Sequence, residues 1–328
     1  MSSPAEVDTD LLIVGAGPVG LYGAYYAGFR GLRTTVIDAL PELGGQITAM
    51  YPEKLIHDIA GFPAVRGRDL VDGLVAQATP FSPTYLLGET ATSLDYDGDQ
   101  PVLETSTGRT IRCQAVIVTG GIGRFDPRPL PVGNEFAGRG LAYFVPQIAD
   151  YADLDVLVVG GGDSAVDWAT TLLPVSRSIT LVHRRERFRA HEHSVIELRE
   201  SAVRILTSSE VCAVHGNGRV EAVEVVHKPT EVVERIPAQA IVAALGFVAD
   251  LGPLEQWGLG IKARRIEVAT TMATNLPRVY AAGDIVAYPG KVRLIAVGFG
   301  EVALAVNNAA VAIDPSLDLF PGHSTQTL

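Results

Sequence analysis

Residues 10–38 read DLLIVGAGPVGLYGAYYAGFRGLRTTVID. The unbroken apolar run at 11–14 is typical of a strand that is buried on both faces. Three glycines follow in G-x-G-x-x-G spacing, and a small-residue segment after them predicts a helix. The β-branched residues 34–37 predict a second strand, which ends in Asp38. The stretch therefore predicts a βαβ unit with a glycine-rich first turn.

Each residue of this turn has a physical task if a dinucleotide binds. Gly15 permits the tight turn, Gly17 lets backbone approach a pyrophosphate, and Gly20 lets the helix pack on the strand. The helix begins near Pro18, where free N–H groups and the positive end of the helix dipole favour phosphates. Asp38 is placed to accept hydrogen bonds from a ribose hydroxyl. We therefore expect dinucleotide binding, with an ordinary glycine-rich βα turn as the alternative.

The composition restricts the class of protein. With 328 residues, 47% hydrophobic and 19% charged, the chain suggests two domains with an ample core. The formal charge of −11 argues against nucleic acid as the main partner. No signal peptide is expected at the N-terminus, and polar residues interrupt the apolar run at 294–311, so no membrane span is expected. We expect Cys113 and Cys212 to be core thiols, which favours a reducing, cytoplasmic location, and we expect no metal site.

The opening pattern recurs later in the chain. Residues 155–167 read DVLVVGGGDSAVD, in which four apolar residues precede Gly160, Gly162 and Ala165 in G-x-G-x-x-A spacing. Asp163 and Ser164 then begin the next predicted helix. In both copies a strand, several short β runs and a final buried strand follow, so the chain contains a duplication.

The C-terminal part indicates how the two copies are organised. Residues 274–284 read TNLPRVYAAGD, a buried strand that ends at Gly283-Asp284, and residues 294–312 predict a long helix of small residues. If this part completes the first domain, that domain is discontinuous. We expect an α/β protein of two Rossmann-like, three-layer domains, of which one (123–249) is inserted into the other (1–122 and 250–328).

The acid that follows the first turn is missing from the second copy. Asp38 lies 23 residues after Gly15, and the residue 23 positions after Gly160 is His183. Guanidinium groups come next: Arg184, Arg185 and Arg189. A 2′-phosphate needs such permanent charges and forked donors, whereas an acid suits an unphosphorylated ribose. We therefore expect FAD in the first site and NADP(H) in the second, with a solvated basic loop as the alternative to the NADP(H) site.

These features resemble the two-dinucleotide flavoproteins of the thioredoxin reductase type. The resemblance rests on the pair of glycine motifs, the inserted domain and the ending TNLPRVYAAGD. It implies that Asp284 holds the ribityl chain of FAD. The HRR-x-x-x-R string of that family's NADPH domain is present here from His183 to Arg189.

One departure distinguishes this chain from true thioredoxin reductases. Those enzymes carry Cys-x-x-Cys before the second glycine motif, where this chain has residues 143–146, YFVP. Cys113 and Cys212 cannot substitute, because disulfide exchange needs two neighbouring thiols beside the flavin. The closer resemblance is to ferredoxin–NADP⁺ reductases of the thioredoxin-reductase-like type. It covers nearly the whole chain and rests on the strings GGQITAMYPEKLIHDIAGFP (44–63), YFV (143–145), GGGDSAVDWA (160–169), HRRERFRAHEHSV (183–195) and PGHST (321–325).

The same resemblance implies further site residues. It places Tyr51 on one face of the isoalloxazine ring and His323 on the other, with the alternatives that Tyr51 is a core aromatic and His323 is solvated. The C-terminal extension, 315–328, is supplied by the other subunit in such proteins, which implies a homodimer. The remaining residues implied at the FAD site are Gln46, Ala91, Phe125 and Ser324.

The expected activity is hydride transfer from NADPH to FAD, followed by release of single electrons to ferredoxin or flavodoxin. Alternatives with the same fold are a diaphorase and a reductase of free flavin or small disulfides. A third alternative is a flavoprotein that senses NADPH without turnover. Because ferredoxins are usually acidic, docking needs a basic patch, for which our candidates are Lys54, Arg66, Arg68, Lys291 and Arg293.

Overall fold

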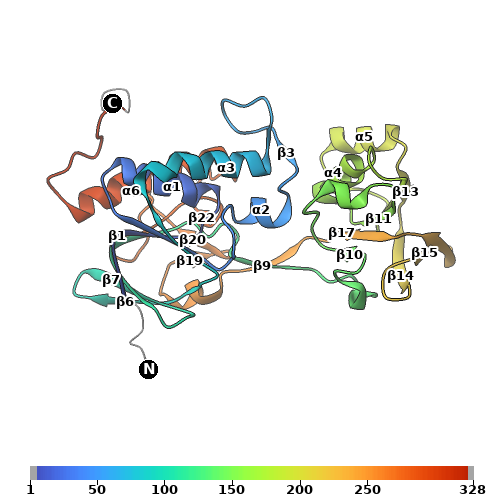
Figure 1. Cartoon of the computed structure of the whole chain (residues 1–328), viewed down its shortest axis with the longest axis horizontal. Helices are drawn as coiled ribbons and strands as arrows, with labels where there is room; N and C mark the ends of the chain where they lie inside the picture. Colours follow the sequence, from blue (N-terminus) through green and yellow to red (C-terminus); the bar gives the residue numbers. More distant parts are fainter. Residues whose placement is uncertain (1–5, 324–328) are drawn as a thin grey trace. The chain divides into compact units, whose positions relative to one another are not determined.

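A computed structural model describes residues 6–323, without the side chains of residues 124, 125, 248 and 249. The chain divides into two compact units (Figure 1). Unit 1 comprises Met1–Arg124 and Ala249–Leu328, and unit 2 comprises Phe125–Val248. The two connecting strands, β9 (Arg124–Pro127) and β18 (Phe247–Asp250), pair with each other in a sheet of their own.

Unit 1 is built on a seven-stranded sheet of order β5-β2-β1-β8-β7-β6, with β21 also paired to β8. Strands β5, β2, β1, β8 and β21 are parallel, and β6, β7 and β8 form an antiparallel meander. β7 pairs with 110–112 of β8 and β21 with 116–118, so both lie along the same edge of this strand. The strands are β1 (Glu6–Val14), β2 (Thr34–Asp38), β5 (Thr84–Leu87), β6 (Ala91–Asp97), β7 (Gln100–Thr105), β8 (Thr110–Val118) and β21 (Val279–Ala281).

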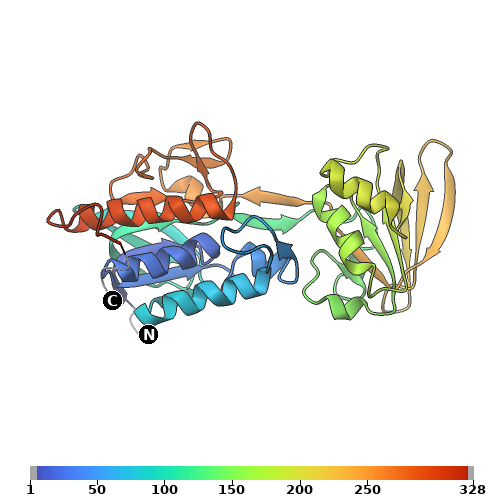
Figure 2. The same cartoon turned by 90° about the horizontal axis from the view of Figure 1, so that it is seen from above.

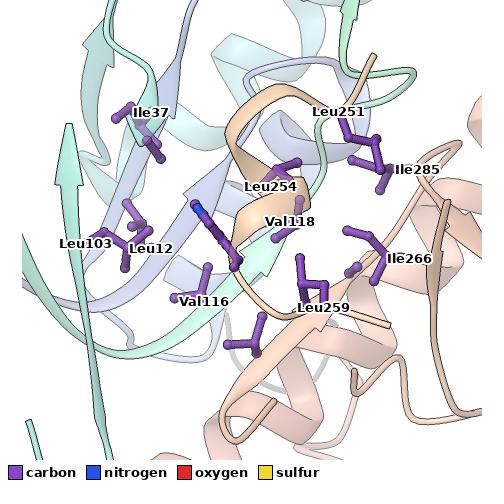
Figure 3. Close-up of a cluster of buried hydrophobic side chains, with 14 of the residues drawn as sticks. Leu12, Ile37, Leu103, Val116, Val118, Leu251, Leu254, Leu259, Ile266 and Ile285 are labelled. Atoms are coloured by element: carbon purple, nitrogen blue, oxygen red, sulfur yellow. The ribbon is translucent and has the colours of Figure 1, made fainter. Parts of the chain in front are cut away.

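Alternate residues of β1 point into different layers of unit 1. Leu11 and Ile13 pack with α1 (Pro18–Phe29) and α6 (Ile295–Ile313), which lie side by side with α3 (Gly67–Ala78) (Figure 2). Leu12 packs on the opposite face with Leu254 and Ile266 (Figure 3). The smaller elements are α2 (Gln46–Met50), β3 (Leu55–Ile56), β4 (Val65–Arg66), η1 (Thr79–Phe81), η4 (Gly252–Gln256), β19 (Ile261–Lys262), β20 (Arg265–Glu267) and β22 (Val286–Ala287).

Unit 2 repeats the design on a smaller scale. Its five-stranded sheet has the order β10-β17-β11-β12-β13 and is parallel throughout. A three-stranded antiparallel sheet, β14-β15-β16, packs on it through a shared hydrophobic core. Its elements are η2 (Asn134–Phe136), β10 (Leu141–Ala142), η3 (Ile148–Tyr151), β11 (Asp155–Val159), α4 (Asp163–Leu172), β12 (Ser178–Val182), α5 (Glu192–Glu200), β13 (Arg204–Leu206), β14 (Ser209–His215), β15 (Ala222–His227), β16 (Val232–Pro237) and β17 (Ala240–Ala243).

Helix α6 confirms the predicted C-terminal helix. It is long and apolar enough, by length and composition alone, to cross a membrane. Its residues Val302, Ala305, Val306 and Ala309 are, however, fully buried against β1 and α1. This packing is that of a core helix in a folded domain.

One cysteine differs from expectation. Cys113 is buried, as predicted, whereas Cys212 is exposed, so the prediction of two core thiols is wrong. The pairing of β14 with β15 shifts register between Val211 and Ala213, which places Cys212 at an irregularity of the strand. Ser209 and Val211 of β14 are buried, so the alternation of the strand places Cys212 on the opposite, exposed face.

Candidate functional site

The first glycine turn is held by contacts that leave one glycine open. A Cβ atom at Gly15, whose φ is +118°, would lie 2.7 Å from the carbonyl oxygen of Thr119. A Cβ atom at Gly20 would lie 1.9 Å from the carbonyl oxygen of Gly15. Gly17 has an ordinary φ of −69°, and a Cβ atom there would meet nothing within 4 Å. Packing therefore requires Gly15 and Gly20, while the space at Gly17 is open to a ligand.

Thr119 is a part of this turn that the sequence analysis missed. Its Oγ1 donates a hydrogen bond to the carbonyl oxygen of Gly15 at 2.8 Å, which ties the turn to the end of β8. A Cβ atom at Gly20 would also come within 2.8 Å of this hydroxyl. A hydroxyl residue directly before Gly120-Gly121 was the only signal in the sequence.

Asp38 ends β2 next to the turn. Its Oδ2 accepts a hydrogen bond from the Ala16 N–H at 2.6 Å, and its Oδ1 accepts one from the Leu40 N–H at 2.8 Å. Burial raises the pKa of Asp38, and these two hydrogen bonds oppose the rise. Because each carboxylate oxygen has a second lone pair, Asp38 can still accept a hydrogen bond from a ligand hydroxyl. The Glu89 N–H bonds the carbonyl oxygen of Asp38 at 3.1 Å, and Ala91, two residues further, is buried in the adjoining core.

The segment after β2 brings Gln46 and Tyr51 to the same turn. A Cβ atom at Gly45 would lie 2.9 Å from the Cα of Gly17, so the start of α2 lies against the turn. The amide nitrogen of Gln46 lies beside Gly121, which follows β8. Burial, and then the negative charge of Asp284, raises the pKa of Tyr51 to about 12. Tyr51 and Asp284 therefore lie within electrostatic reach of each other.

Asp284 follows β21 at a tight turn. Its carbonyl oxygen accepts a hydrogen bond from Arg265 Nε at 3.2 Å, whereas its carboxylate makes no hydrogen bond with any residue that the structure describes. Burial raises the pKa of Asp284, and the positive charges of Lys291 and Arg293 oppose this rise. The carboxylate is thus held in place by its backbone and is free to accept hydroxyl donors.

The C-terminal residues lie elsewhere in unit 1. The first residue of α6, Ile295, packs on the cluster around Ile47 of α2, and the helix then runs about 28 Å to its other end. Beyond it, the Asp318 carbonyl oxygen accepts a hydrogen bond from Arg30 at the end of α1. The ring of His323 packs edge-on against Phe320. In both views, residues 314–323 and α2 are at opposite ends of unit 1 (Figures 1 and 2).

Within one chain, His323 is therefore not brought to Tyr51. The side chain of Phe125 and all of Ser324, which the resemblance also implies at the FAD site, lie outside the described residues.

The second glycine turn has the same backbone geometry as the first. The Gly15 N–H bonds the carbonyl oxygen of Ile37 at 2.8 Å, and the Gly160 N–H bonds that of Val182 at 3.0 Å. Asp38 and His183 are the next residues after these two carbonyls. They therefore occupy equivalent positions, as the 23-residue offset predicts.

His183 is buried against the second turn. A Cβ atom at Gly161 would lie 2.1 Å from the Cε1 of His183, and the imidazole stacks on Phe188 with ring centroids 5.1 Å apart. Burial lowers the pKa of His183, and the positive charges of Arg185, Arg184 and Arg189 lower it further. The neutral imidazole can donate its Nε2–H to the carbonyl oxygen of Arg187, at 3.2 Å.

The arginine segment folds back over this turn. The Arg189 N–H donates to the carbonyl oxygen of Gly161 at 2.8 Å, and the His191 N–H donates to Asp163 Oδ1 at 2.8 Å. The side chains of Arg184, Arg185 and Arg189 are exposed, as is Ser164 at the start of α4. Between residues 6 and 323, none of these arginines forms an ion pair with an acidic side chain. Their charges are therefore available to an anionic ligand.

The predicted basic patch is partly wrong. Lys291 is only 7% exposed and forms an ion pair with Glu301 at 2.5 Å, because the loop before α6 turns its side chain inward. Arg66 and Arg68 both lie near Glu53, which reduces their net charge. Arg293 is exposed. Glu301 is one of the polar residues that interrupt the apolar run at 294–311, and a lone acid in such a helix signals a buried partner.

Within the described chain, no group of three or more His, Cys, Asp or Glu side chains could hold a metal ion. The arrangement thus offers two dinucleotide sites that differ in charge. Unit 1 presents the buried carboxylates of Asp38 and Asp284, and unit 2 presents exposed guanidinium groups.

Comparisons with known proteins give a consistent result. The family model of pyridine nucleotide-disulphide oxidoreductases matches residues 9–311. The chain is 61% identical over 318 residues to the ferredoxin–NADP reductase of Salinispora arenicola, covering 97% of this chain and 98% of the relative. It is 50% identical over 324 residues to that of Thermus thermophilus, covering 97% of each.

Solved structures agree at the level of the fold. The thioredoxin reductase of T. acidophilum superposes with a TM-score of 0.78 at 23% identity, covering 93% of this chain and 97% of that one. The thioredoxin reductase of Lactococcus lactis gives 0.77 at 24% identity, covering 93% and 99%. The predicted fold class and the resemblance to ferredoxin–NADP⁺ reductases are confirmed.

Proposed function

Because the chain belongs to the pyridine nucleotide-disulphide oxidoreductase family, we propose that it is an NADPH-dependent flavoprotein that reduces ferredoxin. FAD binds in unit 1 and NADPH binds in unit 2. Relatives named ferredoxin–NADP reductase that match over nearly the whole chain support this activity. The observation that carries the assignment of the two cofactors is the equivalence of Asp38 and His183 at otherwise matching turns.

The residues of unit 1 fit FAD. The open space at Gly17 and the free N–H groups at the start of α1 suit a pyrophosphate, and Asp38 accepts from the adenosine ribose. Gln46, Ala91 and Asp284 complete the site, with Asp284 accepting from the ribityl hydroxyls. Held by these residues, FAD would supply the chemistry that links two-electron hydride transfer from NADPH to single-electron transfer to a carrier.

The residues of unit 2 fit NADPH. Gly162, like Gly17, has open space at its Cβ position, and Asp163 and Ser164 lie at the start of α4. Arg184, Arg185 and Arg189 bind the 2′-phosphate with permanent charges and forked donors. At the position in unit 2 that is equivalent to Asp38, His183 replaces the acid that would accept a hydrogen bond from a free 2′-hydroxyl. NADH therefore binds less well than NADPH.

Tyr51 stacks on one face of the flavin. Since its pKa is about 12, its phenol stays neutral at every physiological pH and places no charge beside the ring. His323 and Ser324 cover the other face from a second subunit. The remoteness of residues 314–323 from α2 within one chain supports such an exchange in a homodimer.

Two mixed variants test this exchange. One chain is truncated before Pro321, and the other carries Gly17→Leu, which fills the open space that the pyrophosphate needs without a contact between the new Cβ atom and the protein. In the mixed dimer, the truncated chain holds FAD and the other chain supplies the only cover. We expect a flavin absorption spectrum like that of the wild type, which the truncated homodimer lacks. A mixed dimer that keeps the spectrum of the truncated form would contradict exchange.

A disulfide reductase is the alternative that the structure argues against. Cys113 belongs to unit 1 and is buried in its core, whereas Cys212 lies on β14 of unit 2. The two cysteines of the chain therefore form no neighbouring pair. A diaphorase and an NADPH sensor keep both sites and are separated from ferredoxin reduction by experiment.

Anaerobic titration of the FAD-loaded protein tests the proposed function. We expect NADPH to bleach the flavin at far lower concentration than NADH, and added ferredoxin to restore the oxidised spectrum. Flavodoxin is tested in parallel as the other one-electron carrier. Cytochrome c reduction that is independent of ferredoxin would indicate a diaphorase, and bleaching too slow for turnover would indicate a sensor. Preference for NADH would overturn the assignment of unit 2.

The free thiol of Cys113 bears on the location of the protein. It is buried and unpaired with another cysteine, which is compatible with a reducing compartment, and we place the enzyme in the cytoplasm.

Docking of the electron carrier needs a basic contact. On a chain of net charge −11, an acidic ferredoxin needs a local basic contact. Arg293, exposed just before α6 and within electrostatic reach of Asp284, is the candidate that remains best placed.

A further inference from the structure

A buried carboxylate on α6 binds the backbone that carries Asp284. Glu301 is 4% exposed, and its Oε2 accepts a hydrogen bond from the Gly283 N–H at 2.8 Å. Its Oε1 accepts from the Tyr288 hydroxyl and from Lys291 Nζ, both at 2.5 Å. The whole cluster is enclosed, since Lys291 is only 7% exposed.

The packing around this cluster leaves the turn little freedom. Gly298 lies one turn before Glu301 on α6, and a Cβ atom there would be 3.4 Å from the Cα of Gly283 and 2.5 Å from Val19 of α1. Gly283 itself has a φ of +87°, which suits glycine alone. Helix α6 therefore contacts the turn directly, and Glu301 fixes its N–H from the same side.

The two charges of the cluster act on Asp284 with opposite sign. Lys291 favours the ionised carboxylate of Asp284, and Glu301 disfavours it. Because Lys291 Nζ lies 2.5 Å from Glu301 Oε1, the effects of the two charges on the ionisation of Asp284 oppose each other from nearly the same place. The charged and titratable groups that face Asp284 are Lys291, Arg293, Glu301, Arg265 and Tyr51.

We propose that Glu301 and Lys291 are positioning residues for FAD: Glu301 fixes the Gly283–Asp284 turn, and Lys291 balances its charge so that Asp284 can hold the ribityl hydroxyls. This inference rests on the proposed function, which places FAD in unit 1. Neither residue touches the cofactor. Their buried pairing has no other evident task in the core, where an apolar pair would pack without the cost of desolvation.

The experiment measures FAD release from the holoenzyme, by recovery of flavin fluorescence on dilution, between pH 4 and pH 9. Glu301→Gln keeps an oxygen for the Gly283 N–H but removes the negative charge. Lys291→Met keeps the length of the side chain but removes the positive charge. The double variant retains a neutral, similarly shaped pair and shows whether the fold survives. Asp10→Asn is the matched control, because Asp10 pairs with Arg33 in unit 1, at 2.8 Å, and does not face Asp284.

We expect the pH at which acid begins to release FAD to shift in opposite directions in the two single variants. In Lys291→Met, Asp284 is protonated at a higher pH, so release accelerates at a higher pH, by about tenfold at its maximum. In Glu301→Gln the onset moves to a lower pH, and the double variant lies between the two. Asp10→Asn leaves the profile unchanged.

Equal shifts in both single variants, or no shift in either, would overturn the inference, since a purely structural pair changes both rates alike. If Lys291→Met does not fold, Glu301→Gln and the double variant still decide the sign. Failure of the wild-type protein to bind FAD would instead refute the proposed function.

Discussion

The imidazole of His183 lies directly against the backbone of Gly161, so that a single added methyl group at Gly161 would be 2.1 Å from the ring. At the matching turn of unit 1, the Asp38 carboxylate accepts the N–H of Ala16. Both residues thus contact the second residue of their glycine motif. The Asp38 contact is a hydrogen bond accepted by a carboxylate, and the His183 contact is van der Waals packing. The second turn therefore has no acid that could bind a ribose.

Replacement of Gly161 by alanine should therefore act on NADPH alone. The methyl group must displace His183, and with it the segment that the Arg189 N–H ties to Gly161. Overpacking of this kind costs about 1–3 kcal/mol, and we expect kcat/KM for NADPH to fall by about tenfold or more. FAD content should stay at the wild-type level. Gly73→Ala, on the exposed face of α3 with nothing near its Cβ position, is the control.

Removal of the guanidinium groups should reduce the preference for NADPH. Each charged hydrogen bond to the 2′-phosphate contributes about 1.5–3 kcal/mol, so Arg184→Ala or Arg185→Ala should raise KM for NADPH by about ten- to a hundredfold. KM for NADH should hardly change, because it lacks this phosphate. Steady-state kinetics with both nucleotides measure the ratio. Arg219→Ala, exposed on the β14–β15 turn, should leave it unaltered, and an equal loss for both nucleotides would argue against a phosphate contact.

Two glycines of the first turn should fail in different ways. Gly17→Ala has room in the protein and an ordinary φ, so we expect normal thermal stability but faster FAD release. Gly20→Ala places its methyl group 1.9 Å from the carbonyl oxygen of Gly15, so we expect a loss of stability even before FAD is considered. Differential scanning calorimetry and fluorescence of released flavin separate the two effects. Tight FAD binding by Gly17→Ala would contradict the assignment of that space to the pyrophosphate.

The cysteines should be dispensable and unequal in reactivity. Burial raises the pKa of Cys113 to about 12, so at pH 9 only about one thiol in a thousand is ionised. Iodoacetamide at this pH should therefore label the native protein at Cys212 and reach Cys113 only after unfolding, or as the pH approaches 12. Mass spectrometry of tryptic peptides gives the sites. Cys212→Ser should keep full ferredoxin reduction, and its inactivation would revive a thiol mechanism.

Ferredoxin docking should depend on Arg293. Arg293→Glu reverses an exposed charge near the flavin-binding turn, so we expect a higher apparent KM for ferredoxin and a weaker dependence on salt. KM for NADPH should be unaffected, because the proposed NADPH site lies in unit 2. Arg139→Glu changes the same charge on an exposed site of unit 2 and serves as the control. An equal effect of both variants would mean that net charge alone is responsible.

Much of the site could be predicted from sequence because its determinants are local. The strand, glycine turn, helix and terminal acid lie within residues 10–38, and the same spacing exposed the exchange of Asp38 for His183. The backbone bonds of Gly15 and Gly160 show that this spacing reflects a common geometry.

The features that the sequence did not reveal depend on contacts between distant segments. Lys291 follows a loop and resembles any surface lysine until α6 brings Glu301 beside it. Cys212 has strand-like neighbours, but it lies on the exposed face of β14, whereas Ser209 and Val211 on the other face are buried. Thr119 contributes because β8 ends next to a turn that lies more than a hundred residues earlier in the chain. Its Oγ1 donates to the carbonyl oxygen of Gly15 at 2.8 Å. Tertiary packing decides each of these cases.

The pairing of β9 with β18 bears on how such a chain could have arisen. The chain leaves unit 1 and re-enters it through neighbouring strands, and a Cβ atom at Gly123 would lie 2.2 Å from the carbonyl oxygen of Asp250. An ancestral single-domain flavoprotein could therefore acquire a copy of its own nucleotide-binding unit at one surface loop without any rearrangement of its sheet. In such a history, the inserted copy lost its acid and gained arginines. The duplicated unit thereby became the part that binds the electron donor, NADPH, for the flavin of unit 1.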